Sequence, residues 1–139
     1  MAGRSDAEAL EELLVREHEL LSAYEAALRR GAIATSLGEQ FRDHERAHVR
    51  ALEQTLAGHG TRNPRATVPS PDLTAALRDR ESFARYAAHL EEGAIEMYSR
   101  VAAGIGDPKL RQPLGSILTC GAAHVAALRK SVGEPPLLD

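Results

Sequence analysis

The chain has 139 residues, one cysteine and a formal net charge of −3. This length suits a single domain with a buried core, and the mild acidity argues against nucleic acid as a partner, because nucleic-acid-binding domains usually carry a basic patch. The lone Cys120 excludes an intrachain disulfide. Because no long apolar run is present, we expect neither a signal peptide nor a membrane span, and so one cytoplasmic domain with no membrane partner.

Two helices that form a hairpin are predicted over residues 5–58. The first is predicted to begin at Ser5, where Ser-x-x-Glu forms a capping box, and to end at Gly31. The same pattern begins the second helix at Ser36, and Gly58 ends it. Spacings of three or four residues define the inner faces. These comprise Leu10, Leu13, Leu14, Glu17, Leu20, Leu21, Tyr24 and Leu28, followed by Leu37, Phe41, Glu45, His48, Leu52 and Leu56.

A linker is predicted over residues 59–71, because the stretch GHGTRNPRATVPSP is rich in Gly and Pro. Its length is unusual between compact elements but sensible where the chain must cross a bundle from one end to the other. The sequence Ser70-Pro71-Asp72 then predicts the start of a short helix that ends near Leu77.

A second helical hairpin is predicted over residues 72–132, followed by an irregular tail over 133–139. Its first long helix is expected over 82–103, and its second begins at Asp107 with proline at the first helical position. Pro113 is expected to kink this last helix. The predicted inner faces comprise Ala87, Glu91, Ala94, Tyr98 and Val101, followed by Leu110, Leu114, Ile117, Gly121, His124 and Leu128.

The two hairpins resemble each other in sequence. Glu17 and Glu91 each precede a tyrosine by seven residues, and the segment HVRAL at His48 matches HVAAL at His124. This pattern indicates an internal duplication of one helical hairpin. The two tyrosines are expected to pack in the core, where either hydroxyl can hydrogen-bond a carboxylate.

Several ionisable side chains interrupt the predicted apolar faces. They are Glu17, Glu45, His48, Glu91 and His124. Burying one unpaired carboxylate costs on the order of several kcal/mol, so either a cation or mutual pairing must compensate. Glu45-x-x-His48 places both side chains one turn apart on one helix face, where both can reach one ion. The sequence therefore predicts a site for a divalent or trivalent metal cation, with a metal-free, mutually paired cluster as the alternative.

Four segments carry a family resemblance: REHELLSAYEAAL, FRDHERAHVRAL, LEEGAIEMYSR and ILTCGAAHVAALR. The chain resembles the ferritin-like superfamily, which includes bacterioferritins and rubrerythrins, and is similar to its small bacterial members. The resemblance implies an all-α ferritin-like four-helix bundle with a long crossover between helices 2 and 3. It also implies one glutamate ligand each from helices 1 and 3 and a Glu-x-x-His pair each from helices 2 and 4. The matching metal ligands are Glu17, Glu45, His48, Glu91 and His124.

Gly121 departs from the family pattern, because a glutamate that bridges two metals is expected there. Three alternatives follow. One metal is held by the ligands of the first hairpin with help from Glu91 or His124; or Cys120 substitutes as a ligand, whose thiolate favours zinc over iron; or the metal is lost and only the fold remains. The space left by the missing side chain could hold water or an exogenous carboxylate.

A competing motif overlaps the second helix. The run from His44 to His48 reads H-E-x-x-H, the pattern in which two histidines bind zinc and Glu45 acts as general base in a zinc hydrolase. The extended form of the motif fails, because Ala51 and Gln54 stand in place of its glycine and third histidine. The hydrolase hypothesis also leaves the acids of the other helices unexplained.

A third hypothesis is not enzymatic. Leu-rich helical hairpins that bind no metal suit an interaction or assembly module, and two such chains could pair as a homodimer. If iron is bound instead, the expected chemistry is Fe(II) oxidation or activation of oxygen or peroxide. The sequence alone leaves open whether the protein is an enzyme.

Overall fold

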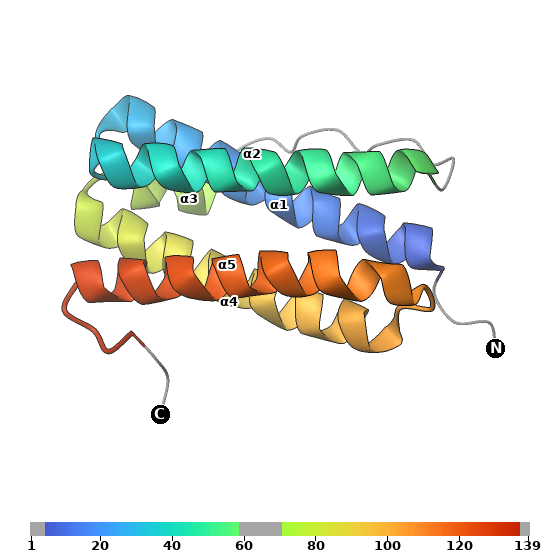
Figure 1. Cartoon of the computed structure of the whole chain (residues 1–139). Coiled ribbons are helices and arrows are strands. Elements are labelled where there is room, and N and C mark those ends of the chain that lie inside the picture. The colour runs from blue at the N-terminus through green and yellow to red at the C-terminus, as the bar shows by residue number, and fades with distance from the viewer. Residues whose placement is uncertain (1–4, 59–70, 137–139) are drawn as a thin grey trace.

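The computed structural model describes residues 5–58 and 71–136, and within these ranges the chain forms helices and no strand. The elements are α1 (Asp6–Arg30), α2 (Thr35–Gly58), α3 (Pro71–Ala76), α4 (Arg80–Gly104), the 3₁₀ turn η1 (Pro108–Leu110) and α5 (Arg111–Ser131). The four long helices pack side by side, with α3 at one end (Figure 1). The predicted all-α four-helix bundle is thus confirmed. None of the helices described here combines the length and apolar character that a membrane span requires.

The ends of α1 follow the sequence prediction. Ser5 Oγ accepts the backbone N–H of Glu8 at 3.1 Å, and the Glu8 carboxylate accepts the backbone N–H of Ser5 at 3.4 Å. Gly31 ends the helix with a φ of 68°, a left-handed conformation that glycine adopts without the strain of a side chain. The α1–α2 hairpin is therefore set by local chemistry that the sequence displays.

Two other helix starts differ from prediction by one or two residues. Helix α2 begins at Thr35, so Ser36 lies inside its first turn and is not the cap. Helix α4 begins at Arg80, because the Asp79 carboxylate accepts the backbone N–H of Ser82 at 2.7 Å and caps the helix there.

The last helix begins in two stages. Asp107 caps as predicted, but the helix that Pro108 opens is the short turn η1, and α5 follows it. Helix α5 continues without a break past Pro113, where a kink was predicted. This proline lies in the first turn of α5, where a backbone N–H has no partner within the helix, so its missing hydrogen bond costs nothing and the helix continues.

The two hairpins are joined across the length of the bundle. Leu56, near the end of α2, packs in one apolar cluster with Leu10 of α1, whereas Leu73 of α3 packs in a second cluster with Phe83 of α4. The end of α2 and the helix α3 lie at opposite ends of the bundle (Figure 1). This placement of the described elements on either side of the gap agrees with the predicted long crossover. The predicted linker falls almost wholly on residues 59–70, which lie outside the described ones.

Two apolar clusters enclose a polar layer in the core. Every residue of the two inner faces predicted for the second hairpin is buried. In α1 and α2 the predicted inner-face residues are also buried, apart from four that are partly buried: Leu21, Leu28, Leu37 and His48. Burial of one large aliphatic side chain contributes about 1.5–3 kcal/mol. This apolar packing on both sides offsets the cost of the ionisable side chains between the clusters.

Candidate metal centre

Five ionisable side chains from all four long helices converge in the layer between the two apolar clusters. The three carboxylates of Glu17, Glu45 and Glu91 and the imidazole of His124 are at most 2% exposed. The fifth, His48, is 12% exposed at its side chain. The expectation that these residues point into the bundle is therefore met by the structure.

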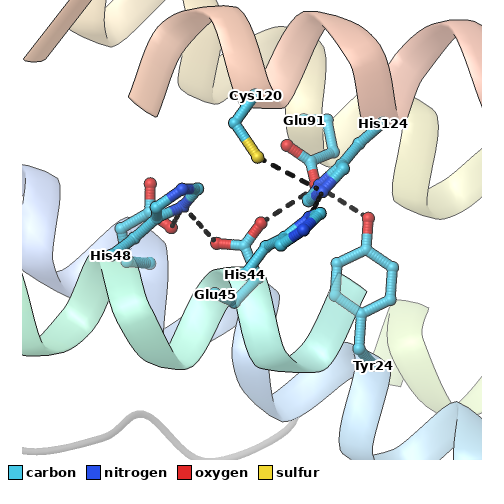
Figure 2. Close-up of polar contacts among 8 residues, drawn as sticks. Tyr24, His44, Glu45, His48, Glu91, Cys120 and His124 are labelled. Carbon is cyan, nitrogen blue, oxygen red and sulfur yellow. Dashed lines mark hydrogen bonds and ion pairs between the residues drawn. The ribbon is translucent and has the colours of Figure 1, made fainter. Parts of the chain in front are cut away.

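Glu45 lies at the centre of the group. Its Oε2 lies 3.3 Å from Nδ1 of His48, which is on the same helix, and its Oε1 lies 3.3 Å from Nδ1 of His124 on α5. Figure 2 shows the Glu45 carboxylate between the two rings. One buried carboxylate thus connects two sets of possible ligands.

The first set comprises Glu17, Glu45 and His48, one donor atom of each lying within 4.8 Å of the others. His48 Nδ1 lies 3.5 Å from Glu17 Oε2. That oxygen and the hydroxyl of Tyr98 are buried, and neither forms a hydrogen bond with any described residue. A buried polar atom without a hydrogen bond is costly, so a metal ion that binds the Glu17 oxygen would satisfy an atom that the protein leaves without one.

The second set comprises Glu45, Glu91 and His124, again with donor atoms within 4.8 Å of one another. Glu91 Oε1 accepts a hydrogen bond from the Tyr24 hydroxyl at 2.7 Å and lies 2.8 Å from Nδ1 of His124. The ring of His124 stacks on Phe41 with 3.9 Å between ring centroids. Tyr24 and Phe41 thus hold the carboxylate and the imidazole in fixed orientations, as partners behind metal ligands commonly do.

The charge balance of the group shifts the pKa values of its members. Burial raises the pKa of Glu45 well above its usual range, and a hydrogen bond with Glu17 raises it further. Burial also raises the pKa of Glu17, but its interactions with Glu45 and with the charged His48 outweigh that effect and lower it. Without a metal, a proton on Glu45 thus stabilises the neighbouring carboxylate.

Both imidazoles are held in their charged form. Burial lowers the pKa of His48, but hydrogen bonds with Cys120, Glu17 and Glu45 raise it to about 12. The pKa of His124 is raised to about 11 against burial by hydrogen bonds with Cys120, Glu45 and Glu91. Protons therefore supply, in the metal-free protein, the positive charge that a cation would otherwise bring.

Gly121 leaves a small space beside the carboxylates. A Cβ at this position would lie 3.3 Å from Glu91 Oε2 and 3.5 Å from Ile95 Cγ1. The adjoining cavity has a volume of about 10 Å³ and is lined by residues that include Glu17, Glu45 and Tyr98. This is roughly the space for one water molecule or ion. An exogenous carboxylate, which the sequence left open, does not fit without movement of side chains.

Two further residues join the site from its edge. His44 Nδ1 lies 2.9 Å from Nε2 of His124, and Cys120 Sγ lies 3.6 Å from the same nitrogen. The sequence signals were the spacing of Cys120 and His124 by four residues and the HExxH motif, but neither predicted that His44 and Cys120 meet at one ring.

The geometry does not favour the zinc hydrolase hypothesis. The ring of His44 is directed toward His124 on α5, and that of His48 toward Glu17 and Glu45. Over residues 5–58 and 71–136, no group of three possible ligands contains both His44 and His48. The Glu45 carboxylate, the general base of that hypothesis, is instead paired with two histidines.

Four long helices that bring buried carboxylates and imidazoles to one level define a class, the carboxylate–histidine four-helix bundles. The family model of the ferritin-like domain matches residues 5–134 of this chain. The chain therefore belongs to the ferritin-like family, and its donor groups fit a metal-binding member. No curated protein matches the sequence.

Proposed function

We propose that the protein binds one or two divalent transition-metal ions in this centre, with iron as the first candidate and manganese or zinc as alternatives. The first position comprises Glu17, Glu45 and His48, and the second, weaker one comprises Glu45, Glu91 and His124. One observation carries the proposal: the Glu45 carboxylate lies between His48 and His124, at 3.3 Å from each Nδ1. Oxygen and imidazole donors of this kind suit iron and manganese.

Three features of the described residues support this fit. Glu17 Oε2 is buried and has no hydrogen bond beside its 3.5 Å ion pair with His48, so a cation can take the place of the imidazole's proton there. A cavity of about 10 Å³ adjoins the carboxylates and has space for roughly one ion or water. When the two imidazoles are neutral, as metal ligands are, the negative charge of the three buried carboxylates is left without compensation, and a divalent cation offsets most of it.

Bound iron supplies one-electron chemistry, with Fe(II) as the electron donor and oxygen or peroxide as the acceptor. The chain contributes orientation and control of protons. The Tyr24 hydroxyl holds Glu91 Oε1 in place at 2.7 Å, and Phe41 holds the ring of His124. The apolar clusters above and below shield the carboxylates from bulk solvent. Glu45 and the two histidines hold the protons that must leave when a cation binds.

The proposal is tested by anaerobic titration of metal-free protein with Fe(II), followed by exposure to air. We expect one ion to bind tightly and a second more weakly, and the bound Fe(II) to oxidise faster than the same concentration in buffer. Elemental analysis of protein purified without added metal identifies the native ion. Failure to bind Fe(II), Mn(II) or Zn(II) at the carboxylates would contradict the proposal and favour the metal-free module.

Gly121→Glu is expected to raise the Fe(II) stoichiometry toward two ions per chain. The new carboxylate enters beside Glu91, whose Oε2 must move by a few tenths of an ångström because a Cβ would lie 3.3 Å from it. A further carboxylate at the second position supplies the ligand that the family pattern places there. Anaerobic Fe(II) titration measures the stoichiometry.

Gly115→Glu is the matched control for this variant. It adds the same side chain to the same helix at an exposed position with no heavy atom within 4 Å of its Cβ, and should leave the stoichiometry unchanged. If Gly121→Glu folds and binds no more Fe(II) than the parent, position 121 does not limit the second ion.

A further inference from the structure

A second group of donors lies at the seam between α2 and α5, outside the carboxylates. One donor atom each of His44, Cys120 and His124 lies within 4.8 Å of the other two. His124 Nε2 is the shared point, 2.9 Å from His44 Nδ1 and 3.6 Å from Cys120 Sγ. In Figure 2 the rings of His44 and His124 overlap, and the Cys120 sulfur points toward His124.

This outer group differs from the carboxylate centre in accessibility. His44 and Cys120 are half-buried, whereas Glu45, Glu91 and His124 are fully buried. An ion at the outer group can therefore reach its ligands from solvent without opening the bundle. The rings of His44 and His124 are nearly parallel, at 7°, and Phe41 stacks on His124, so the rings are held in place. The 2.9 Å contact between the two ring nitrogens must lengthen slightly when both bind one ion.

The outer group also differs in chemistry. It offers one sulfur and two imidazole nitrogens and no carboxylate. Sulfur and imidazole ligands favour zinc over iron, manganese or magnesium, and three protein ligands leave a fourth tetrahedral position for water. The ligands bind in deprotonated form: the neighbouring histidines already lower the pKa of the Cys120 thiol to about 6, and the proton on Nε2 of the charged His124 leaves to solvent when zinc binds.

We propose that His44, Cys120 and His124 form a separate Zn²⁺ site at the α2–α5 seam, with water as the fourth ligand. His124 is the residue that the two centres share: its Nε2 faces the zinc ligands, and its Nδ1 faces Glu45 and Glu91. An imidazole that binds two metals must lose both ring protons, which is unfavourable near neutral pH. Zinc at the seam therefore competes with the second carboxylate position, a consequence that rests on the proposed function, but leaves the first position free.

Cobalt(II) tests the site, because it replaces zinc and gives a thiolate-to-metal charge-transfer band only when a sulfur binds it. Metal-free protein is titrated with Co²⁺, and the bound Co²⁺ is then displaced with Zn²⁺ to obtain the zinc affinity. We expect the band in the parent and its loss in Cys120→Ser. The zinc affinity of Cys120→Ser and of His44→Gln should fall by about 100-fold or more, since loss of an outer-shell partner alone typically costs about 10–100-fold.

Two controls separate this site from the carboxylate centre. His89→Gln makes the same substitution as His44→Gln at an exposed position of α4 and should leave zinc binding unchanged. Glu17→Gln alters only the first carboxylate position, so the charge-transfer band should remain while iron binding at that position is lost. Absence of the band in the parent overturns the proposal. So does a band that Glu17→Gln abolishes and His44→Gln does not, because Cys120 would then be a ligand of the inner centre.

Discussion

Glu45→Ala is expected to abolish tight metal binding at both carboxylate positions. The Glu45 oxygens lie 3.3 Å from Nδ1 of His48 and 3.3 Å from Nδ1 of His124, so this one carboxylate belongs to both ligand sets. Removal of any other acid affects one set only. We expect the Fe(II) affinity to fall by more than about 100-fold, because loss of an outer-shell partner alone typically costs about 10–100-fold. Anaerobic Fe(II) titration and elemental analysis measure the loss.

Three further variants make this result specific. Glu39→Ala removes an exposed acid from the same helix and should bind metal as the parent does. Glu45→Gln keeps the size of the side chain but not its charge, so it should fold normally and still fail to bind Fe(II) tightly. His44→Ala should lose zinc from the seam and retain Fe(II). Two Fe(II) ions bound to Glu45→Ala with the parent's affinity would show that Glu45 does not connect the two positions.

Zinc loss in His44→Ala has two explanations that one further variant separates. In the hydrolase hypothesis His44 and His48 bind the ion and Cys120 does not, so Cys120→Ser should retain zinc. In the seam site Cys120 is a ligand, so the same variant should release it. The distance of 2.9 Å between His44 Nδ1 and His124 Nε2 favours the second outcome.

The fold could be predicted because its cause is local. The spacing of Leu10, Leu13 and Leu14 predicts one buried face on α1, and all three are at most 1% exposed. Helix ends are less predictable, because several neighbouring residues can cap. Near the start of α4, the sequence alone does not show that it is the Asp79 carboxylate that accepts the N–H of Ser82 and caps the helix.

The polar layer could be predicted in its members but not in its connections. Periodicity shows that Glu45 lies on the inner face of α2, but the position of its two oxygens depends on side-chain torsions and on how the helices are tilted. The same holds at the seam. His44 and Cys120 each come one residue before an inner-face position, Glu45 and Gly121, so both lie at the edges where α2 and α5 meet. The position of each residue directly before an inner-face residue could therefore have predicted that His44 and Cys120 lie close together.

Metal affinity is expected to rise with pH across the whole range from about 6 to 9. Metal ligands must be deprotonated, and the metal-free centre holds protons on Glu45, on His48 with a pKa of about 12 and on His124 with a pKa of about 11. Each proton that an ion displaces makes its affinity rise about tenfold per pH unit. A histidine with the ordinary pKa of 6.5 would stop contributing above that pH, whereas these two continue.

The stability of the metal-free protein should change in the opposite direction. The pKa of His48 is 6.5 in the unfolded chain and about 12 in the folded protein. The charged imidazole therefore stabilises the fold fully below pH 6.5, and this stabilisation is lost as the pH rises toward about 12. The thermal midpoint should fall from neutral to alkaline pH. Hydrogen bonds with His124 and His48 lower the pKa of the Cys120 thiol to about 6, and this raises the stability as the pH rises. The change of the thermal midpoint with pH is therefore measured in Cys120→Ser as well.

Fe(II) titrations by calorimetry in buffers of different ionisation enthalpy count the protons released when the metal binds. His48→Gln should release about one fewer, and a metal affinity that levels off above about pH 7 would show that the imidazoles are not held in their charged form.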